Sequence, residues 1–410
     1  MPKSRVTAIA AAIALAVGSA AATTTAVAQE KPSVSKGAAK TLKAAQDALV
    51  ANNYDEVLAK TAEAKGVSGL SSYDKYVIAQ FETQAYARKG NLGEAAKAME
   101  AQLETGFGTP AEKVQIQKGL SSIAYQQKNY AKAADMGQQV IAAGGADAET
   151  YTVVAQSYFL QNKYDDTIKF LGDYVGDQEK KGQQPKEQTL QLMSESYSKK
   201  GDTNGATASL EKLVAYYPKP IYWNNLLYTM MRAEGNTDVV TLNIYRLMLD
   251  TGTLKQPSDF TEMAQLAIER GTPCEAKKVL ERGAAENVFV EQRDKERNQR
   301  LLESSTKLCQ QDQAGIGKFA TEAQAAKSGE GDVRLGQAYL SFDQADKAVE
   351  PIQRGITKGS LKSNEEAQIL LGMAQLKQKK VDDAVKSFKS VKGDPKWTRL
   401  ANLWALHAKA

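Results

Sequence analysis

The 410-residue chain has two cysteines and one histidine with which to do chemistry. Cys274 and Cys309 are not arranged as C-x-x-C, which disfavours a redox-active dithiol. Such a pair forms a disulfide in an oxidising compartment, whereas two separate thiols would be small apolar fillers of a core. His407 is the only imidazole, so a Ser-His-Asp triad and a multi-histidine zinc site lack their residues. We therefore expect no catalytic residue, no cofactor and no metal.

Two further patterns imitate functional motifs. Adjacent acids such as Asp165 and Asp166 could do acid-base work, but they stand where helices should begin, and negative charge there complements the helix dipole. The segment GIGKFA (315–320) resembles a dinucleotide fingerprint, yet only a polar run precedes it and no strand. We expect it to be the turn of an irregular repeat. The sequence thus predicts a protein that is not an enzyme.

The N-terminus has the composition of a secretory signal peptide. Lys3 and Arg5 precede an apolar run over residues 6–17, and small residues lead to Ala28. We expect residues 1–28 to be removed. Cleavage near residue 20 is an alternative, and so is an uncleaved anchor, although the apolar run is short for a membrane span.

Removal of Lys3 and Arg5 would leave 51 of the 53 basic residues against 48 acidic ones. That small positive excess gives no reason to expect nucleic-acid binding. The expected product has no stable membrane span after cleavage. Its expected location is the periplasm, in a Gram-negative cell envelope.

A helix-turn-helix phrase repeats about every 36 residues along the mature chain. The second helix of each unit opens on an anchor residue, and these are Val57, Ala95, Ala133, Thr167, Ala206, Val240, Ala276, Ala348 and Ala384. The interval from Ala276 to Ala348 is double, so a degenerate unit should lie at about 291–327. The period predicts an all-α solenoid of about ten units over residues 38–394, after a short linker at 29–37 and before a last helix at 395–410.

This layout resembles the tetratricopeptide repeat family. The resemblance implies a right-handed superhelix in which the first helix of each unit lines a concave groove. It also implies that the last helix is a capping helix that shields the final repeat from solvent. Anchor alanines should face small residues such as Gly336 and Gly372 across each unit, with large apolar residues such as Ile352 and Phe388 one turn further on.

The second half resembles a narrower group. Four segments occur in order, namely YYPKPIYW (216–223), GTPCEAKKVLERG (271–283), GITKGSL (355–361) and LLGMA (370–374). They are similar to those of periplasmic tetratricopeptide proteins associated with TonB-ExbB-ExbD systems, the TtpC-like group. This resemblance implies a protein-binding scaffold with ExbB, ExbD or TonB-type partners. The alternative is an envelope assembly factor for polysaccharide, peptidoglycan or outer-membrane proteins, which would bind glycan or unfolded chain. Oligomeric state stays open.

Extrapolation of the family's groove positions gives a set of candidate partner-binding residues. They are Gln191, Glu195, Tyr222, Asn225 and Arg232. Aromatic side chains with Asn and Arg nearby are residue types that anchor protein partners. The alternative is that the aromatic residues of this unit, above all Trp223 and Tyr228, are core.

The repeat also bears on the two cysteines. Cys274 opens the second helix of one unit, and Cys309 should lie near the end of the first helix of the next. Consecutive helices of such a stack are antiparallel neighbours, so both thiols should meet at one edge. The pair is therefore a disulfide candidate, which would contribute about 2–4 kcal/mol by closing its loop. Two buried thiols remain the alternative.

Overall fold

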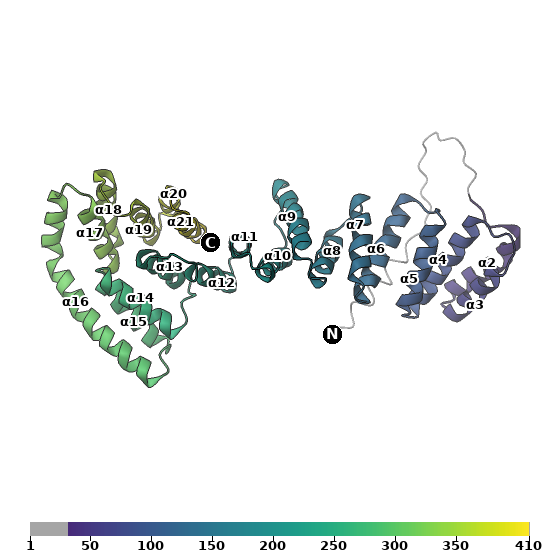
Figure 1. Ribbon diagram of the computed structural model, residues 1–410, viewed down its shortest axis with the longest axis horizontal. Helices are drawn as coiled ribbons and strands as arrows, with labels where there is room; N and C mark the ends of the chain where they lie inside the picture. The colour runs from purple at the N-terminus through teal and green to yellow at the C-terminus, as the bar shows by residue number, and fades with distance from the viewer. Residues whose placement is uncertain (1–31, 410) are drawn as a thin grey trace. The chain divides into compact units, whose positions relative to one another are not determined.

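A computed structural model describes residues 32–409, so the predicted signal peptide lies outside the described residues. Residues 32–409 form twenty α-helices and no strand, which confirms the all-α class (Figure 1). No helix in this range is long and apolar enough to cross a membrane. The chain divides into two compact units, one made of residues up to 185 with 195–202, the other of 186–194 with 203–410. Each unit is described by itself.

The first unit contains α2 (Lys36–Val50), α3 (Tyr54–Lys65), α4 (Ser72–Arg88), α5 (Leu92–Glu104), α6 (Pro110–Gln126), α7 (Tyr130–Ala142), α8 (Ala148–Leu160), α9 (Tyr164–Lys180) and the end of α10 (Glu187–Lys200). The second contains the start of α10 with α11 (Thr203–Tyr216), α12 (Pro220–Met231), α13 (Asp238–Asp250), α14 (Pro257–Glu269), α15 (Pro273–Ala285), α16 (Gln292–Ala325), α17 (Glu330–Ser341), α18 (Ala345–Lys358), α19 (Asn364–Lys377), α20 (Val381–Lys389) and α21 (Pro395–His407).

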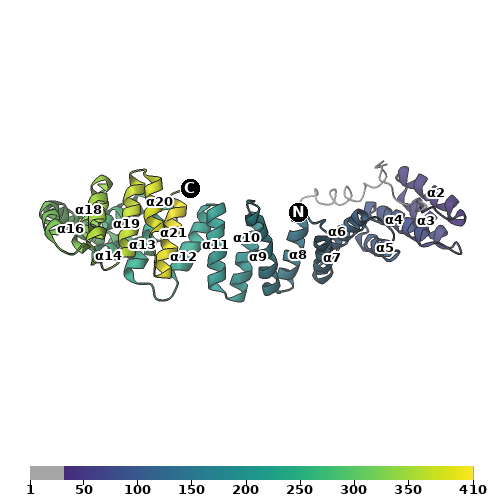
Figure 2. The same cartoon turned by 90° about the horizontal axis from the view of Figure 1, so that it is seen from above.

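In the first unit, local sequence sets where each helix begins. The second helices α3, α5 and α7 each start after an asparagine whose side chain accepts a backbone N–H of the first turn. The first helices α4, α6 and α8 instead start with capping boxes, built on Ser71, Thr109 and Asp147. First helices of neighbouring pairs contact one another, as α2 contacts α4 and α6 contacts α8. The result is the row of stacked pairs in Figure 2.

The predicted packing of small against large residues is present in the second unit. Gly336 and Gly372 lie so close to the second helix of their pairs that a Cβ on either would overlap a neighbour. The neighbours are Ile352 and the carbonyl of Ala348 for Gly336, and the ring of Phe388 for Gly372. Ala348, Ile352 and Phe388 are fully buried. Close helix approach is therefore what fixes glycine at these two positions.

The degenerate unit at 291–327 is not a helix-turn-helix. It is the single 34-residue helix α16, so the described chain has nine helix pairs and one long helix where ten pairs were predicted. The expected turn at 315–320 is wrong, because these residues lie inside α16. Gly315 and Gly317 weaken a helix by only about 1 kcal/mol each relative to alanine, and no proline interrupts the segment.

The last helix lies against the final repeat and also packs on helices from much earlier in the chain. It buries six residues, among them Trp397 and Trp404. Helix α21 packs on α19 and α20, but also on α11 and α13, which precede it by more than 140 residues. Helix α13 is correspondingly buried on all sides, with Val240 and Met248 among its eight buried residues. The second unit thus closes on itself around α13 (Figure 1).

We predict opposite effects for two glycine substitutions. Gly372→Ala should lower the free energy of unfolding of the second unit by about 1–3 kcal/mol through overpacking against Phe388. Gly315→Ala is the matched control, because a Cβ there meets nothing within 4 Å, and it should raise stability by about 0.5–1 kcal/mol. Denaturation followed by tryptophan fluorescence measures both. A loss of similar size for both variants would contradict the packing account.

Candidate functional site

Tyr222 is buried and is therefore not an accessible candidate for partner binding. Its side chain is only 5% exposed. Its hydroxyl donates to the Glu187 carboxylate and accepts from the Gln191 amide, while Lys219 pairs with Glu187 at 2.7 Å. Burial and the Glu187 carboxylate raise the pKa of Tyr222 to about 12. Tyr222 therefore supports the packing of α12 on α10, which corrects its prediction as a partner anchor.

The other candidates differ in setting. Asn225 and Arg232 are exposed on α12 and at its end, and Gln191 is exposed on α10 beside Tyr222. Glu195 is also exposed but belongs to the first unit. Within the second unit the structure brings together only Gln191 and Tyr222 by a direct contact.

The neighbouring aromatic residues Trp223 and Tyr228 pack inside the second unit, which was the alternative to a partner-binding role. Trp223 is buried and its ring packs edge-on against His407. The Tyr228 hydroxyl donates to Asp259, and that of Tyr245 donates to Glu262 at 2.9 Å. Burial, together with the accepting carboxylate, raises the pKa of both tyrosines. These hydroxyls link successive repeats and are not offered to a partner.

The first unit has an accessible row of mostly polar side chains on its first helices, and none of the five predicted candidates belongs to it. We call it the inner stripe, and it comprises Gln80, Gln84, Arg88, Lys118, Ser122, Gln126, Thr152, Gln156 and Leu160, three from each of α4, α6 and α8. All are exposed or half-buried. Gln156 accepts from Tyr125, and Lys118 pairs with Asp147 at 2.9 Å.

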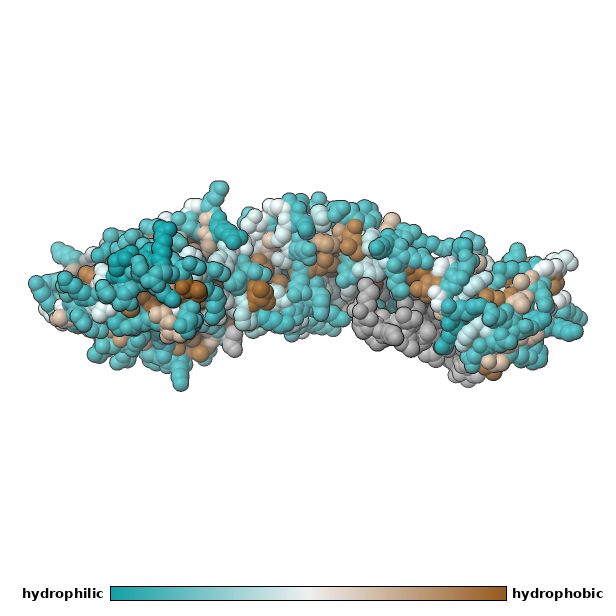
Figure 3. All heavy atoms as spheres, turned by 90° about the horizontal axis from the view of Figure 1, so that it is seen from below, coloured by the Kyte–Doolittle hydropathy of each residue, from teal (hydrophilic) through white to brown (hydrophobic). Residues whose placement is uncertain are grey.

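The rest of the inner stripe is available for hydrogen bonding. The side chains of Gln80, Gln84, Ser122 and Gln126 make no hydrogen bond to any other described residue. Leu160, at 45% exposure, adds an apolar contact. Neutral amides and hydroxyls of this kind suit the backbone of a bound polypeptide. On the face drawn in Figure 3, apolar side chains otherwise form small separate patches.

A buried ion-pair network holds the second unit closed. Arg246 of α13, 4% exposed, donates to both carboxylate oxygens of Glu275 at 2.8 and 2.7 Å. Its guanidinium also lies 3.8 Å from Glu366 of α19, which accepts from Asn243 at 3.2 Å. Burial alone would raise the pKa of Glu275, but Arg246 lowers it below the ordinary value of 4.5. For Glu366, burial outweighs Arg246 and raises the pKa.

Helix α21 completes the closure through three polar contacts. His407 bonds to Asp250 at 2.7 Å, Arg399 pairs with Glu211 at 2.7 Å, and Lys396 donates to the carbonyl of Glu234 at 2.6 Å. The hydrogen bond from His407 lowers the pKa of Asp250 against the effect of burial. Sequence reasoning missed the contacts of α13 with Glu366 and those of α21, because these partners are at least 120 residues apart and no local pattern joins them.

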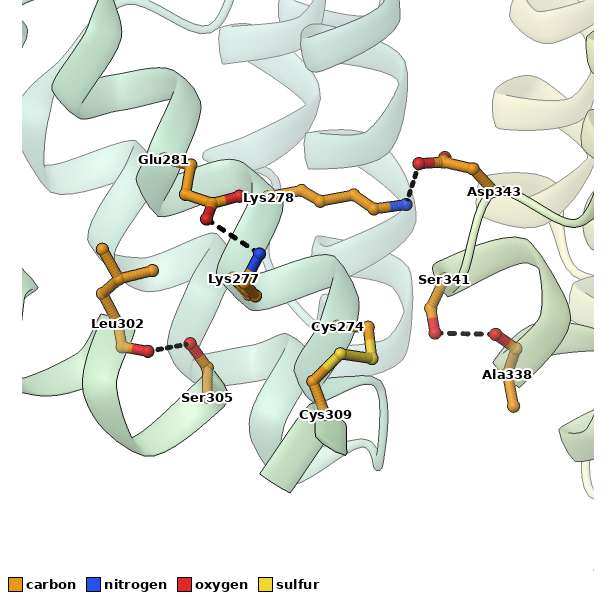
Figure 4. The surroundings of a disulfide bond; sticks show 10 residues. All are labelled: Cys274, Lys277, Lys278, Glu281, Leu302, Ser305, Cys309, Ala338, Ser341 and Asp343. Atoms are coloured by element: carbon orange, nitrogen blue, oxygen red, sulfur yellow. Dashed lines mark hydrogen bonds and ion pairs between the residues drawn. A yellow bond between two sulfur atoms is a disulfide. The ribbon is translucent and has the colours of Figure 1, made fainter. Parts of the chain in front are cut away.

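Cys274 and Cys309 form a disulfide, with Cα atoms 4.6 Å apart (Figure 4). Both residues are buried, at 1% and 6% exposure. Cys274 begins α15, whereas Cys309 lies in the middle of α16 and not near a helix end, because α16 is continuous. The bond fastens the long helix to the preceding pair.

The geometry defines an α-solenoid built from helix pairs, and comparison with known families specifies the repeat. A family model described as tetratricopeptide repeat matches residues 83–148, and a second one matches 188–220 and 366–394. These three segments of the chain therefore match tetratricopeptide repeats. These repeats imply a scaffold that binds protein partners, typically without catalysis. No curated protein matches the chain.

Solved structures of the same kind are similar over most of the chain. A tetratricopeptide repeat protein from Parabacteroides merdae is 12% identical, covers 80% of this chain and 98% of its own, and gives a TM-score of 0.31. Yeast Tom70 is 12% identical over 91% of this chain and 95% of its own, with a TM-score of 0.25. The TPR2AB domain of yeast Sti1 in complex with pHSP90 is 11% identical over 73% and 100%, with a TM-score of 0.26. At these values the likeness carries no functional inference.

We predict that the two glutamates beside Arg246 are not equivalent. Glu275→Gln should destabilise the second unit by about 3–5 kcal/mol at pH 7, because the buried guanidinium loses its main counter-charge. Glu366→Gln should leave the stability of the second unit nearly unchanged or raise it, because burial already disfavours the ionised form of Glu366.

The pH dependence of the free energy of unfolding checks that Glu275 is the ionised partner of Arg246. A lowered pKa means that Glu275 contributes stability above pH 4.5, and this contribution is lost as pH falls through the folded-state pKa. The gap between wild type and Glu275→Gln in guanidinium unfolding should therefore narrow below pH 4.5. If Glu275→Gln and Glu366→Gln lower the free energy of unfolding equally at pH 7, the predicted difference between the two glutamates is wrong.

We also predict that loss of the disulfide weakens only one unit. The double variant Cys274→Ala/Cys309→Ala should lose about 2–4 kcal/mol in the second unit. Hydrogen exchange of α4–α7 should not change, since both cysteines belong to the other unit. Mass spectrometry of non-reduced peptide digests of the purified protein should show the linked pair. Free, alkylatable thiols there would contradict the bond.

Proposed function

We propose that this protein is a periplasmic, non-enzymatic scaffold that binds protein partners along the inner stripe of its first unit. The observation that carries the proposal is the set of unbonded side-chain amide and hydroxyl groups on α4 and α6. These are first helices of their pairs, and the resemblance to tetratricopeptide repeats implies that such helices line a concave groove. A bound chain can satisfy those groups with its own backbone. In the second unit Tyr222 is not available to a partner, because its hydroxyl is bonded to Glu187 and Gln191.

The proposed location rests on two supports. The sequence begins with a signal-peptide pattern, and a buried pair of cysteines is bonded. Disulfides persist in the periplasm and are rare in the cytosol. The proposed partners are components of a TonB-type energy-transduction complex, ExbB, ExbD or TonB, on the strength of the four segments similar to the TtpC-like group.

An envelope assembly role is the second candidate. The same amide-rich stripe would also hydrogen-bond the hydroxyls of a glycan, or the backbone of an unfolded outer-membrane protein. The identity of captured molecules separates the two candidates.

Site-specific photo-crosslinking in the native envelope tests the proposal. A photoreactive residue at Gln84 or Gln126, on the inner stripe, should yield adducts with a defined protein partner. The matched controls are Lys97 and Lys169, exposed on the second helices α5 and α9, and these should yield none. Adducts with ExbB, ExbD or TonB support the energy-transduction role, whereas porin-assembly factors or glycan support the alternative. If control and stripe positions capture the same molecules, the stripe is not the binding surface.

A further inference from the structure

The inner stripe changes in chemical character along the first unit. Helices α4, α6 and α8 are the first helices of three successive pairs, and each ends on a residue of the stripe (Figure 2). These last residues are Arg88, Gln126 and Leu160, so they occupy the same level in the three pairs. A cation, a neutral amide and an alkyl group therefore lie in that order along one edge of the stripe.

Arg88 is the unpaired charge of the stripe. The other cation, Lys118, is paired with Asp147 at 2.9 Å, and the stripe contains no carboxylate. Arg88 is exposed, and its guanidinium makes no hydrogen bond or ion pair with another described residue. A cation in the last turn of a helix interacts favourably with the helix dipole, but α6 and α8 have none there, so the repeat does not require it. The guanidinium is thus available to an anionic group of a partner.

The opposite end of this edge is apolar. Leu160 is 45% exposed and is the only large apolar side chain of the stripe. The other side chains near this edge, Gln84, Ser122 and Gln126, have unbonded amide and hydroxyl groups. Such groups can bond the backbone of a chain of any sequence, whereas a cation and an apolar contact select side chains. The two ends of the edge therefore determine which chains fit.

The spacing of the helices sets how far apart the two selected side chains of a partner must be. Helix α6 contacts α8 within the stack. Packed helices lie about 8–10 Å apart, so the two steps from α4 to α8 cover about 16–20 Å. An extended chain advances about 3.3 Å per residue, so about five or six residues span this distance.

We propose that the inner stripe binds an extended polypeptide segment with an acidic side chain opposite Arg88 and an apolar side chain opposite Leu160, about five or six residues apart. The carboxylate accepts from the guanidinium, the apolar group contacts Leu160, and the backbone between them bonds to Gln126 and its neighbours. Charge complementarity with the unpaired arginine makes the bound segment acidic at that end. This inference rests on the proposed protein-binding function and specifies the chemistry of the bound segment.

Selection from a displayed library of random peptides of about twelve residues, twice the expected spacing, tests the inference on the immobilised protein. Wild type should enrich peptides in which Asp or Glu lies about five or six positions from Leu, Ile, Val or Phe. Arg88→Glu should enrich Lys or Arg in place of the acid, and Leu160→Ser should lose the apolar preference.

Lys75→Glu is the matched control and should enrich the same peptides as wild type. Lys75 is exposed, makes no ion pair with a described residue and belongs to the same helix as Arg88. It lies about 140° around that helix from Arg88, away from the stripe.

Titration of a selected peptide by fluorescence anisotropy measures the size of the effect. Arg88→Glu should weaken binding at least about fivefold at low salt, because an attractive ion pair becomes a repulsive one. The difference from wild type should shrink at about 1 M salt, since exposed charges are then screened. Arg88 and Leu160 are both exposed, so their variants should fold, and circular dichroism checks this.

Several outcomes would overturn the proposal. They are no enrichment by wild type, enrichment of the same peptides by wild type and Arg88→Glu, or a dimer that Arg88→Glu dissociates, which would make a second copy of the chain the occupant. Photo-crosslinking at Gln84 and Gln126 separates this failure from failure of the scaffold. Adducts with a protein partner there would support the proposed function without this specificity, whereas adducts with glycan would contradict both.

Discussion

The closure of the second unit around α13 depends on a single buried cation. Arg246 lies in the middle of a helix that is covered on all sides, and a guanidinium without counter-charge there would be costly. Glu275 from α15 supplies its main counter-charge, and Glu366 from α19 lies 3.8 Å away and accepts from Asn243 of α13. These contacts join α13 to repeats on α15 and α19. The burial of α21 and the use of Trp223 as core accompany that arrangement.

The repeats differ in which of their polar groups already have a partner. In the second unit, polar groups of successive repeats bond to one another, as Tyr228 does with Asp259 and Tyr245 with Glu262. In the first unit, Gln84 and Gln126 remain without a described partner. Repeats of one kind can thus supply a binding surface in one part of the chain and structural support in another. The difference lies in which polar groups are already satisfied, and not in the helix-pair fold itself.

The long helix α16 is the weakest element by apolar burial and is fastened covalently. Only Asn298, Ser305, Cys309 and Ala323 of its 34 residues are buried. So little buried apolar surface contributes little to holding the helix in place. The bond from Cys309 to Cys274 supplies a constraint that packing does not, by tying the middle of α16 to the start of α15. A departure from the repeat pattern therefore coincides with the only crosslink in the chain.

The sequence by itself determined what local physics controls. The 36-residue period, the asparagine caps such as Asn53 and the small residues such as Gly336 each act within one repeat, so their pattern was sufficient to predict helix pairs and their packing. Sequence reasoning failed on α16, where a turn was expected although nothing stops the helix, and on Tyr222, whose exposure depends on Glu187 and Gln191. Only the tertiary structure decided that the second unit closes around α13. The contacts of His407 with Asp250 and of Arg246 with Glu366 span more than 100 residues, and such long-range ion pairs produce no periodic pattern in a sequence.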